Sequence, residues 1–127
     1  MINVGLTGKA QSIVTNENTA KTMKSGSLDV YATPALVALM EQAACNALED
    51  KLEKGTTTVG IKMDVQHIAA TPLGLNVSAK ASVIEVDERK IIFHVEAFDD
   101  KELIGKAVHS RFIVKTDKFM DKANAKK

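Results

Sequence analysis

The stretch TPALVALMEQAACNAL, residues 33–48, decides the fold, because it reads as one apolar helix with a single charged residue in its middle. Helical neighbours three, four and seven positions apart share a face. The neighbours that share a face with Glu41 are small or apolar: Val37, Ala38, Ala44, Cys45 and Leu48. The pattern therefore predicts that Glu41 points toward the protein core.

A carboxylate in that position needs a partner or a task. An unpaired buried carboxylate costs several kcal/mol or is driven to its protonated form. One interpretation is that Glu41 reaches solvent or a subunit interface, and the other is that it belongs to a functional site. For Cys45, on the same face, we favour a small buried hydrophobic side chain over a nucleophile.

Clear signals mark both ends of this helix. Thr33 can cap the free backbone amides, and Pro34 loses nothing at the first helical position. We expect the helix to run to about Lys54 and to stop at Gly55. Its charged second half is expected to emerge into water.

Beyond Gly55 the hydrophobic period changes to that of strands. In residues 59–69, VGIKMDVQHIA, alternation predicts one face with Val59, Ile61, Met63, Val65 and His67, and an opposite face with Gly60, Lys62, Asp64 and Gln66. His67 is then in phase with the buried face. Further strands are predicted at about 8–15, 75–87, 90–100 and 102–116, and the Lys-rich tail, residues 117–127, is expected to be frayed.

One apolar helix followed by hairpin-linked strands predicts an α+β protein. The expected architecture is a hotdog fold, an antiparallel β-sheet wrapped around one long central helix. The 127 residues are expected to form a single domain, because no linker or repeat interrupts them. A sheet covered by one helix leaves apolar surface exposed, so we expect a homodimer or a dimer of dimers.

Composition argues against several classes of partner. The net charge is +1, and the chain has one Tyr and no Trp, so we expect no nucleic acid partner. No apolar stretch approaches the ~20 residues that span a bilayer, and the N-terminus lacks a signal-peptide pattern. With one cysteine, this predicts a cytoplasmic protein without a membrane partner. The three histidines lie on separate predicted strands without a short ligand spacing, so we expect no metal.

Three segments resemble the signature segments of the fluoroacetyl-CoA-type thioesterases, a subfamily of hotdog proteins. They are VYATPALVALMEQAA (residues 30–44), TTVGIKMDVQHIAATPLG (57–74) and GKAVHSRFIV (105–114). The similarity runs in register from about Gly26 to Val114. Two positions depart from the family pattern: Gln66 stands where Arg is common, and Ala107 stands where a second Gly is frequent.

The resemblance implies hydrolysis of an acyl-CoA thioester. Coenzyme A is then part of the substrate, and no other cofactor is implied. The catalytic set that the family implies falls on Thr33, Glu41 and His67, and Gly60 matches a glycine near the thioester carbonyl.

The residue types suit this chemistry independently of the resemblance. Thioester hydrolysis needs an activated oxygen nucleophile, a proton carrier, and donors for the developing oxyanion. His67 can carry protons near neutrality, and Glu41 can orient that imidazole or act as the base itself. Thr33 sits at a helix N-terminus, where the dipole favours negative charge, and Gly60 would let a substrate approach the strand backbone.

Each of these residues also has a purely structural interpretation: Thr33 as a cap, His67 as a satisfied core histidine, and Gly60 as a bulge. Eight helical residues separate Thr33 from Glu41 by ~12 Å along the axis, so they cannot touch. Either His67 bridges them, or a second subunit completes the site. Whether Thr33 attacks the thioester or orients a water stays open.

Two further features are candidates for substrate contact. His109 and Arg111 lie on one face of the last strand, and Arg suits phosphate groups by bidentate hydrogen bonding, so the pair is a candidate contact for coenzyme A. A solvated strand face is the alternative. The polar stretch ENTAKTMKSGSL, residues 17–28, is either a mobile lid or an ordinary connection. His94 receives no role.

The sequence therefore predicts an acyl-CoA thioesterase that hydrolyses a small acyl-CoA to the free acid and coenzyme A. The alternatives are a non-catalytic acyl-CoA binding module, and a hotdog dehydratase or hydratase that leaves the thioester intact.

Overall fold

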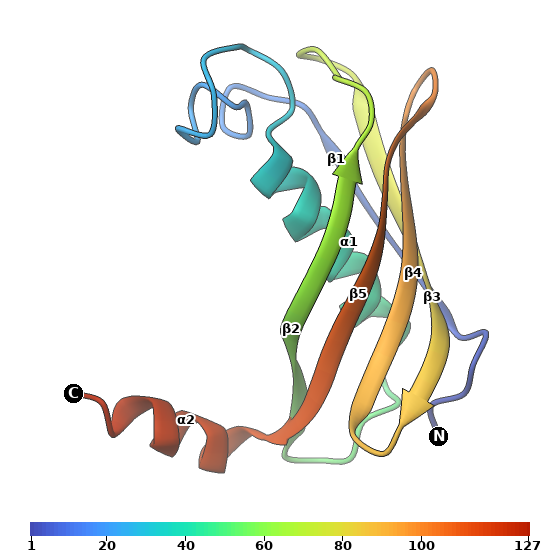
Figure 1. The fold of residues 1–127 in the computed structure, drawn as a ribbon, viewed down its shortest axis with the longest axis vertical. Coiled ribbons are helices and arrows are strands. Elements are labelled where there is room, and N and C mark those ends of the chain that lie inside the picture. Colours follow the sequence, from blue (N-terminus) through green and yellow to red (C-terminus); the bar gives the residue numbers. More distant parts are fainter.

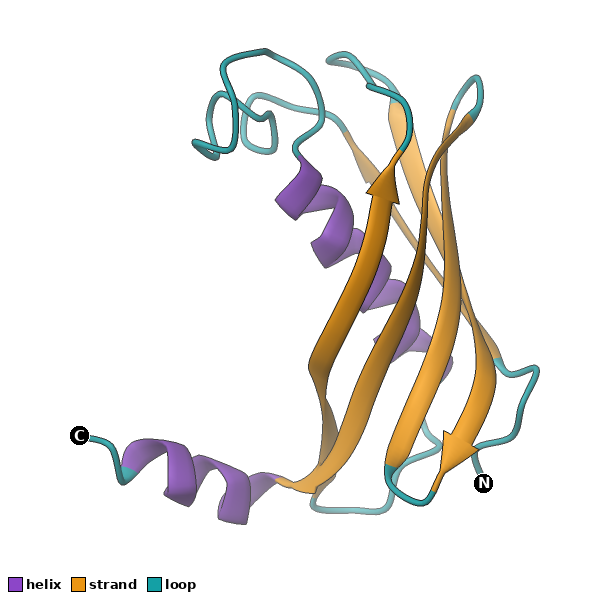
Figure 2. Ribbon diagram, viewed as in Figure 1, coloured by secondary structure: helices purple, strands orange, loops and turns teal.

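The structure, a computed structural model, describes all residues from 1 to 127. Five antiparallel strands form one sheet in the order β1-β3-β4-β5-β2. The sheet curls around α1, and α2 projects from one end (Figures 1 and 2). This is the predicted hotdog architecture. The elements are β1 (Thr7–Ile13), α1 (Thr33–Ala47), β2 (Thr56–His67), β3 (Asn76–Asp87), β4 (Lys90–Asp99), β5 (Leu103–Lys115) and α2 (Thr116–Asn124).

The core lies between α1 and the inner face of the sheet. Leu36 and Met40 are fully buried on α1; both approach Gly105 of β5, and they share one core cluster with Phe93 of β4. Small residues let β1 approach the helix closely: a methyl group added to Gly8 would collide with the backbone of Ala47. The side chain of Asn46 then donates to the Lys9 carbonyl at 2.7 Å, which ties α1 to this edge strand.

The helix ends earlier than predicted, at Ala47 rather than at Lys54. Leu48 is buried, and the chain then turns through Asp50, which has a left-handed φ of 63°. Asp is one of the few residues other than Gly that adopt this conformation readily. The turn allows Leu52 to pack against the core, whereas a continued helix would have carried it past the sheet.

Thr33 is not the helix cap. Ala32 holds the N-cap position without a side-chain hydrogen bond, and Thr33 is the first residue of α1. The hydroxyl group of Thr33 is therefore free of the capping role that the sequence suggested for it.

A β-bulge in β2 corrects the predicted faces of that strand. Gly60 pairs with Arg111 and Lys62 with Ser110, so Ile61 is an extra residue without a partner. Met63, Val65 and His67 face inward as predicted, because their β5 partners lie on the inner face. Val59 and Ile61 do not share that face, and Gly60 does. Alternation counted from the sequence cannot reveal an inserted residue.

The tail is helical rather than frayed. α2 spans Thr116–Asn124, with Asp117 in its first turn and Lys122 in its last, an order that complements the helix dipole. None of its residues is buried. Neither helix of the protein is long and apolar enough to cross a membrane.

Candidate active site

Thr33 and His67 meet where α1 begins and β2 ends, at the same end of the molecule (Figure 1). Thr33 Oγ1 lies 2.8 Å from His67 Nδ1. The other ring nitrogen, Nε2, is buried and has no hydrogen-bond partner in the chain. A buried polar atom without a partner is uncommon and calls for an explanation. Here a ligand or a second protein chain would supply one.

Burial lowers the pKa of His67, and this effect outweighs the opposite effect of the Ala69 backbone. The imidazole is therefore held neutral at neutral pH, which is the state a general base requires. His67 is thus not a satisfied core histidine, because one nitrogen bonds Thr33 and the other bonds nothing.

A hollow of about 260 Å³ opens beside this pair. The segment before α1 forms one wall: Ala20 donates to the Val30 carbonyl at 2.8 Å, so the polar stretch is an ordered series of turns. Whether it moves as a lid stays a prediction. The lining residues are Ala20, Ser25, Val30, Tyr31, Thr33, His67, Ile68, Ala69 and Ala70.

Glu41 lies in a second group of polar side chains, farther along α1. Its Oε2 forms an ion pair of 3.2 Å with Arg111, and the side chain of Glu41 is 41% exposed whereas that of Arg111 is 8% exposed. Glu41 therefore lies partly at the surface, against Gly60 of β2, rather than in a sealed core. The interpretation that Glu41 reaches solvent agrees with this exposure, and the interpretation that Glu41 belongs to a functional site stays a prediction.

Gly60 lies against this ion pair. A methyl group at Gly60 would come within 2.6 Å of Glu41 Oε2, 3.2 Å of Arg111 Nη1 and 3.3 Å of His109 Cε1. The position is thus more than a bulge, because the missing side chain leaves the space that the Glu41 carboxylate fills. The sequence predicted that a substrate approaches Gly60, and in the structure the nearest side-chain atom to this space is Glu41 Oε2.

His109 and Arg111 are buried, with 1% and 6% of their surface exposed, so they do not form a solvated strand face. Arg111 makes four hydrogen bonds within the chain: to Thr58 Oγ1, the Thr58 carbonyl, Glu41 and His109. A guanidinium has five N–H donors, which leaves little for a phosphate group. Sequence spacing placed the two residues on one face but gave no sign that this face meets Glu41.

The two polar groups do not touch. No hydrogen bond joins Glu41 to Thr33 or His67, so His67 does not bridge them within one chain. Gly60 and His67 nevertheless lie on the same edge strand, β2, and the Glu41 carboxylate lies beside Gly60 of that strand. The candidate site therefore has two parts along the same side of the molecule.

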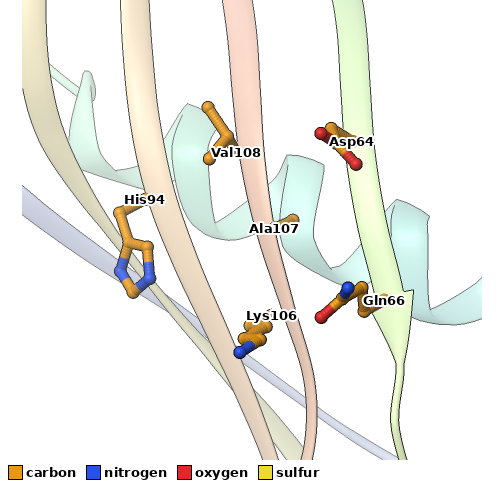
Figure 3. A pocket seen from close by; sticks show the side chains of 6 residues that line it. All are labelled: Asp64, Gln66, His94, Lys106, Ala107 and Val108. Carbon is orange, nitrogen blue, oxygen red and sulfur yellow. The ribbon is translucent and has the colours of Figure 1, made fainter.

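Other chemistry-bearing residues lie outside these groups. Figure 3 shows a shallow hollow on the outer face of the sheet, with α1 behind the strands. Its lining includes His94 and Gln66, the residue that stands where the family commonly has Arg. Gln66 therefore does not reach the candidate active site of its own chain. Cys45 is exposed rather than buried, a correction to its predicted role. No cluster of three or more His, Cys, Asp or Glu side chains is placed to hold a metal ion.

Comparison with known proteins adds a family to this geometry. A profile of the family described as fluoroacetyl-CoA-specific thioesterase matches residues 14–117, a span that contains both polar groups. The chain belongs to this family. The fluoroacetyl-CoA thioesterase of Streptantibioticus cattleyicolor is 37% identical over 98 residues, which are 77% of this chain and 70% of that protein.

Solved structures of fluoroacetyl-CoA-specific thioesterase agree. One superimposes with a TM-score of 0.94 at 30% identity and covers 100% of this chain and 98% of the other. A mutant solved in complex with acetyl-CoA has a TM-score of 0.93 at 30% identity, with 98% of each chain covered. As a member of the fluoroacetyl-CoA-specific thioesterase family, the chain is a thioester hydrolase of hotdog fold.

Proposed function

We propose that this protein hydrolyses the thioester of a small acyl-CoA, with Thr33, Glu41 and His67 as its catalytic residues. The observation that carries the proposal is the Thr33–His67 pair, a hydroxyl hydrogen-bonded to a half-buried neutral imidazole beside a hollow. Alanines line much of that hollow, which suits a short acyl group. Fluoroacetyl-CoA and acetyl-CoA, named with the relatives, are the first substrates to try.

The geometry favours Thr33 as the nucleophile. His67 Nδ1 takes the hydroxyl proton while Oγ1 attacks the thioester carbonyl carbon. The tetrahedral intermediate then expels the coenzyme A thiolate, which takes the proton from His67. Water attacks the acyl-threonine ester with His67 as base, and the acid and free Thr33 result. The free amides at the start of α1 are available for the oxyanion.

The competing route is direct attack by water, with Thr33 only orienting it. Three measurements separate the routes. On the nucleophile route Thr33→Ser retains measurable thiol release, Thr33→Ala loses nearly all of it, and rapid quenching with a slow substrate traps an acyl group on the peptide that contains Thr33. Absence of an acylated peptide, with a tenth or more of the activity left in Thr33→Ala, would establish water attack.

We also propose that two copies pair along β2 and that the pairing completes the site. β2 is the last strand of the sheet and pairs only with β5, so its outer backbone groups lack partners. Beside it, Ala38 and Cys45 are exposed on α1, and Ile68 is 51% exposed just beyond β2. A two-fold pairing would set the His67 end of one β2 opposite the Thr56 end of the other.

The position of α2 supports the same pairing. It leaves the sheet beside the start of β2 and projects past that edge (Figures 1 and 2). Phe119 and Met120 are 41% and 48% exposed, whereas Asp117, Lys118 and Asp121 line a hollow with the protein's own turn before β2. The apolar side of α2 thus faces away from its own chain, toward the space of a second copy.

Mixing two inactive variants tests the shared site. If Thr33 and His67 of one chain work with Glu41 of the other, a mixture of Thr33→Ala and Glu41→Gln protein, unfolded and refolded together, gains activity that neither parent has. No gain would show that both parts act within one chain, and a monomer by light scattering at micromolar concentration would refute the pairing.

A further inference from the structure

His109 is the least accessible member of the Glu41 group. It lies on the inner face of β5 with 1% of its surface exposed, and its ring stacks against Phe93 with centroids 6.3 Å apart. A substrate therefore cannot touch it, and any influence on the reaction must pass through its neighbours.

The neighbours of His109 fix its tautomer. Nδ1 lies 2.7 Å from the Lys62 carbonyl oxygen, and Nε2 lies 3.2 Å from Arg111 Nη1. A carbonyl only accepts hydrogen bonds and a guanidinium only donates them. Nδ1 must therefore carry the hydrogen and Nε2 must be bare, so the ring is neutral.

Glu41 needs such support. Its side chain is 41% exposed, and an exposed ion pair by itself restricts a carboxylate little, contributing about 0–1 kcal/mol. Arg111 is different, because its guanidinium group is buried and is fixed by hydrogen bonds to three residues, Thr58, His109 and Glu41. The same nitrogen, Nη1, bonds both Glu41 and His109.

We propose that His109 is a positioning residue, which as the neutral Nδ1–H tautomer holds Arg111, and through Arg111 holds the Glu41 carboxylate against Gly60. The role rests on the proposed function, because it matters for turnover only if Glu41 takes part in catalysis. Neither His109 nor Arg111 is then a contact for coenzyme A.

Protonation of His109 breaks this arrangement. A proton on Nε2 sets N–H against N–H and places two cations side by side, so Arg111 Nη1 must turn away from His109 and from Glu41. Arg111 and Glu41 are the charged groups that face His109, from β5 and α1; β2 offers it the Lys62 carbonyl and β4 the Phe93 ring. Burial lowers the pKa of His109, and together with Arg111 it outweighs the Lys62 carbonyl and Glu41, which raise that pKa, so the neutral form persists into mild acid.

Two amide variants separate the two hydrogen bonds of His109. The side-chain amide of His109→Asn can still donate a hydrogen bond to the Lys62 carbonyl. The Asn side chain is too short to accept a hydrogen bond from Arg111 as well. The longer His109→Gln can place its oxygen near the Nε2 position. We expect His109→Asn to lower kcat about 100-fold with KM little changed, since a misplacement of about 1 Å has that cost. His109→Gln should have at least about ten times the kcat of His109→Asn.

The control is His94→Asn, on the outer face of the sheet, which should keep the wild-type kcat and KM. Circular dichroism and melting temperature establish that each variant is folded. Equal kcat in His109→Asn and wild type would overturn the proposal.

A double-mutant cycle tests whether His109 acts through Glu41. In the Glu41→Gln background, His109→Asn should lower kcat by no more than about twofold. A full 100-fold loss in that background would overturn the proposal, because His109 would then act by another path.

A measurement that does not depend on catalytic activity separates the role of His109 from the proposed thioesterase function. In ¹⁵N NMR at neutral pH, His109 should show a protonated Nδ1 and a bare Nε2, and the reverse tautomer would refute the arrangement. If the wild type releases no thiol from any acyl-CoA, the proposed function fails, while the tautomer still decides whether His109 holds Arg111.

Discussion

Gly60 is the residue at which the Glu41 part of the candidate site depends on a missing side chain. It faces inward because Ile61 is an extra residue in the strand, and the Glu41 carboxylate fills the space beside it. A side chain there would compete with Glu41 rather than with the backbone. The effect of a substitution should therefore appear in catalysis before it appears in folding.

Gly60→Ala should lower kcat about 100-fold by displacing the Glu41 carboxylate. The melting temperature should change by only a few degrees, because the atom that must move is the end of a flexible, partly exposed side chain. Steady-state thiol release and thermal unfolding measure both effects. Ile61→Ala, at the exposed neighbouring position, is the control. Normal kinetics with a large loss of melting temperature would mark Gly60 as a structural glycine only.

For single residues, the sequence predicted which side chains are candidates for the site better than it predicted which side chains contact one another. Thr33 and Gly60 became candidates through the resemblance to a family, whereas Glu41 and His67 also stood out because a polar side chain is unusual on an apolar face. The ion pair of Glu41 and Arg111 was not predictable, because 70 positions separate the partners. No local pattern reports which face of a distant strand a helix will meet.

Among the elements, β1 and α1 depend on close contact between their backbones. Gly8→Ala would force the backbone of Ala47 to move, and overpacking of this kind costs about 1–3 kcal/mol. We expect the free energy of unfolding in urea to fall by that amount, with kcat per folded molecule unchanged. Gln11→Ala, at an exposed position of the same strand, should leave both values as in the wild type. An equally stable Gly8→Ala protein would show that α1 does not pack as described.

α2 should matter for assembly rather than for folding. Deletion of residues 117–127 removes no buried side chain, so the melting temperature should fall by no more than a few degrees. The proposed dimer should dissociate at a higher protein concentration than in the full-length chain, because Phe119 and Met120 are lost. Sedimentation velocity over a dilution series measures this. The test variant carries Phe119→Ser and Met120→Ser, and its matched control carries Lys118→Ser and Lys122→Ser. If both double variants dissociate at the same protein concentration, α2 makes no apolar contact with a second copy.

Element existence was predictable from the sequence, and element boundaries were less so. Every strand was placed because alternating apolar residues and turn signals are local properties of the chain. The end of α1 was wrong because Leu52 packs better after a turn than on a longer helix. α2 was missed because nine residues with two large apolar side chains give too short a stretch for a period to show.

For the whole molecule, two histidines, the buried His109 and the half-buried His67, make stability depend on pH. Burial lowers the pKa of both His67 and His109 below the unfolded value of 6.5, and at His109 it outweighs the opposite effect of the Lys62 carbonyl. Below that pH the unfolded chain binds more protons than the folded protein. These groups leave the free energy of unfolding constant above 6.5 and reduce it as the pH falls below 6.5 toward their folded values.

Urea unfolding at about pH 7.5, 6 and 5 measures this dependence. His109→Gln should show a shallower decline than the wild type, because one of the two groups no longer titrates. His94→Asn, at an exposed position, should show the wild-type decline. A decline in His109→Gln as steep as that of the wild type would mean that other groups cause it.

The bulge at Ile61 changes how the number of residues between Gly60 and His67 relates to the faces on which they lie. Gly60 and His67 are separated by an odd number of positions, and in a regular strand such residues project to opposite sides. The extra residue reverses this parity, so both project inward. In related chains, the parity of the glycine-to-histidine interval should therefore be odd wherever the bulge is kept and even wherever it is lost. An insertion or deletion of a single codon in this interval would be tolerated only if it created or removed the bulge itself.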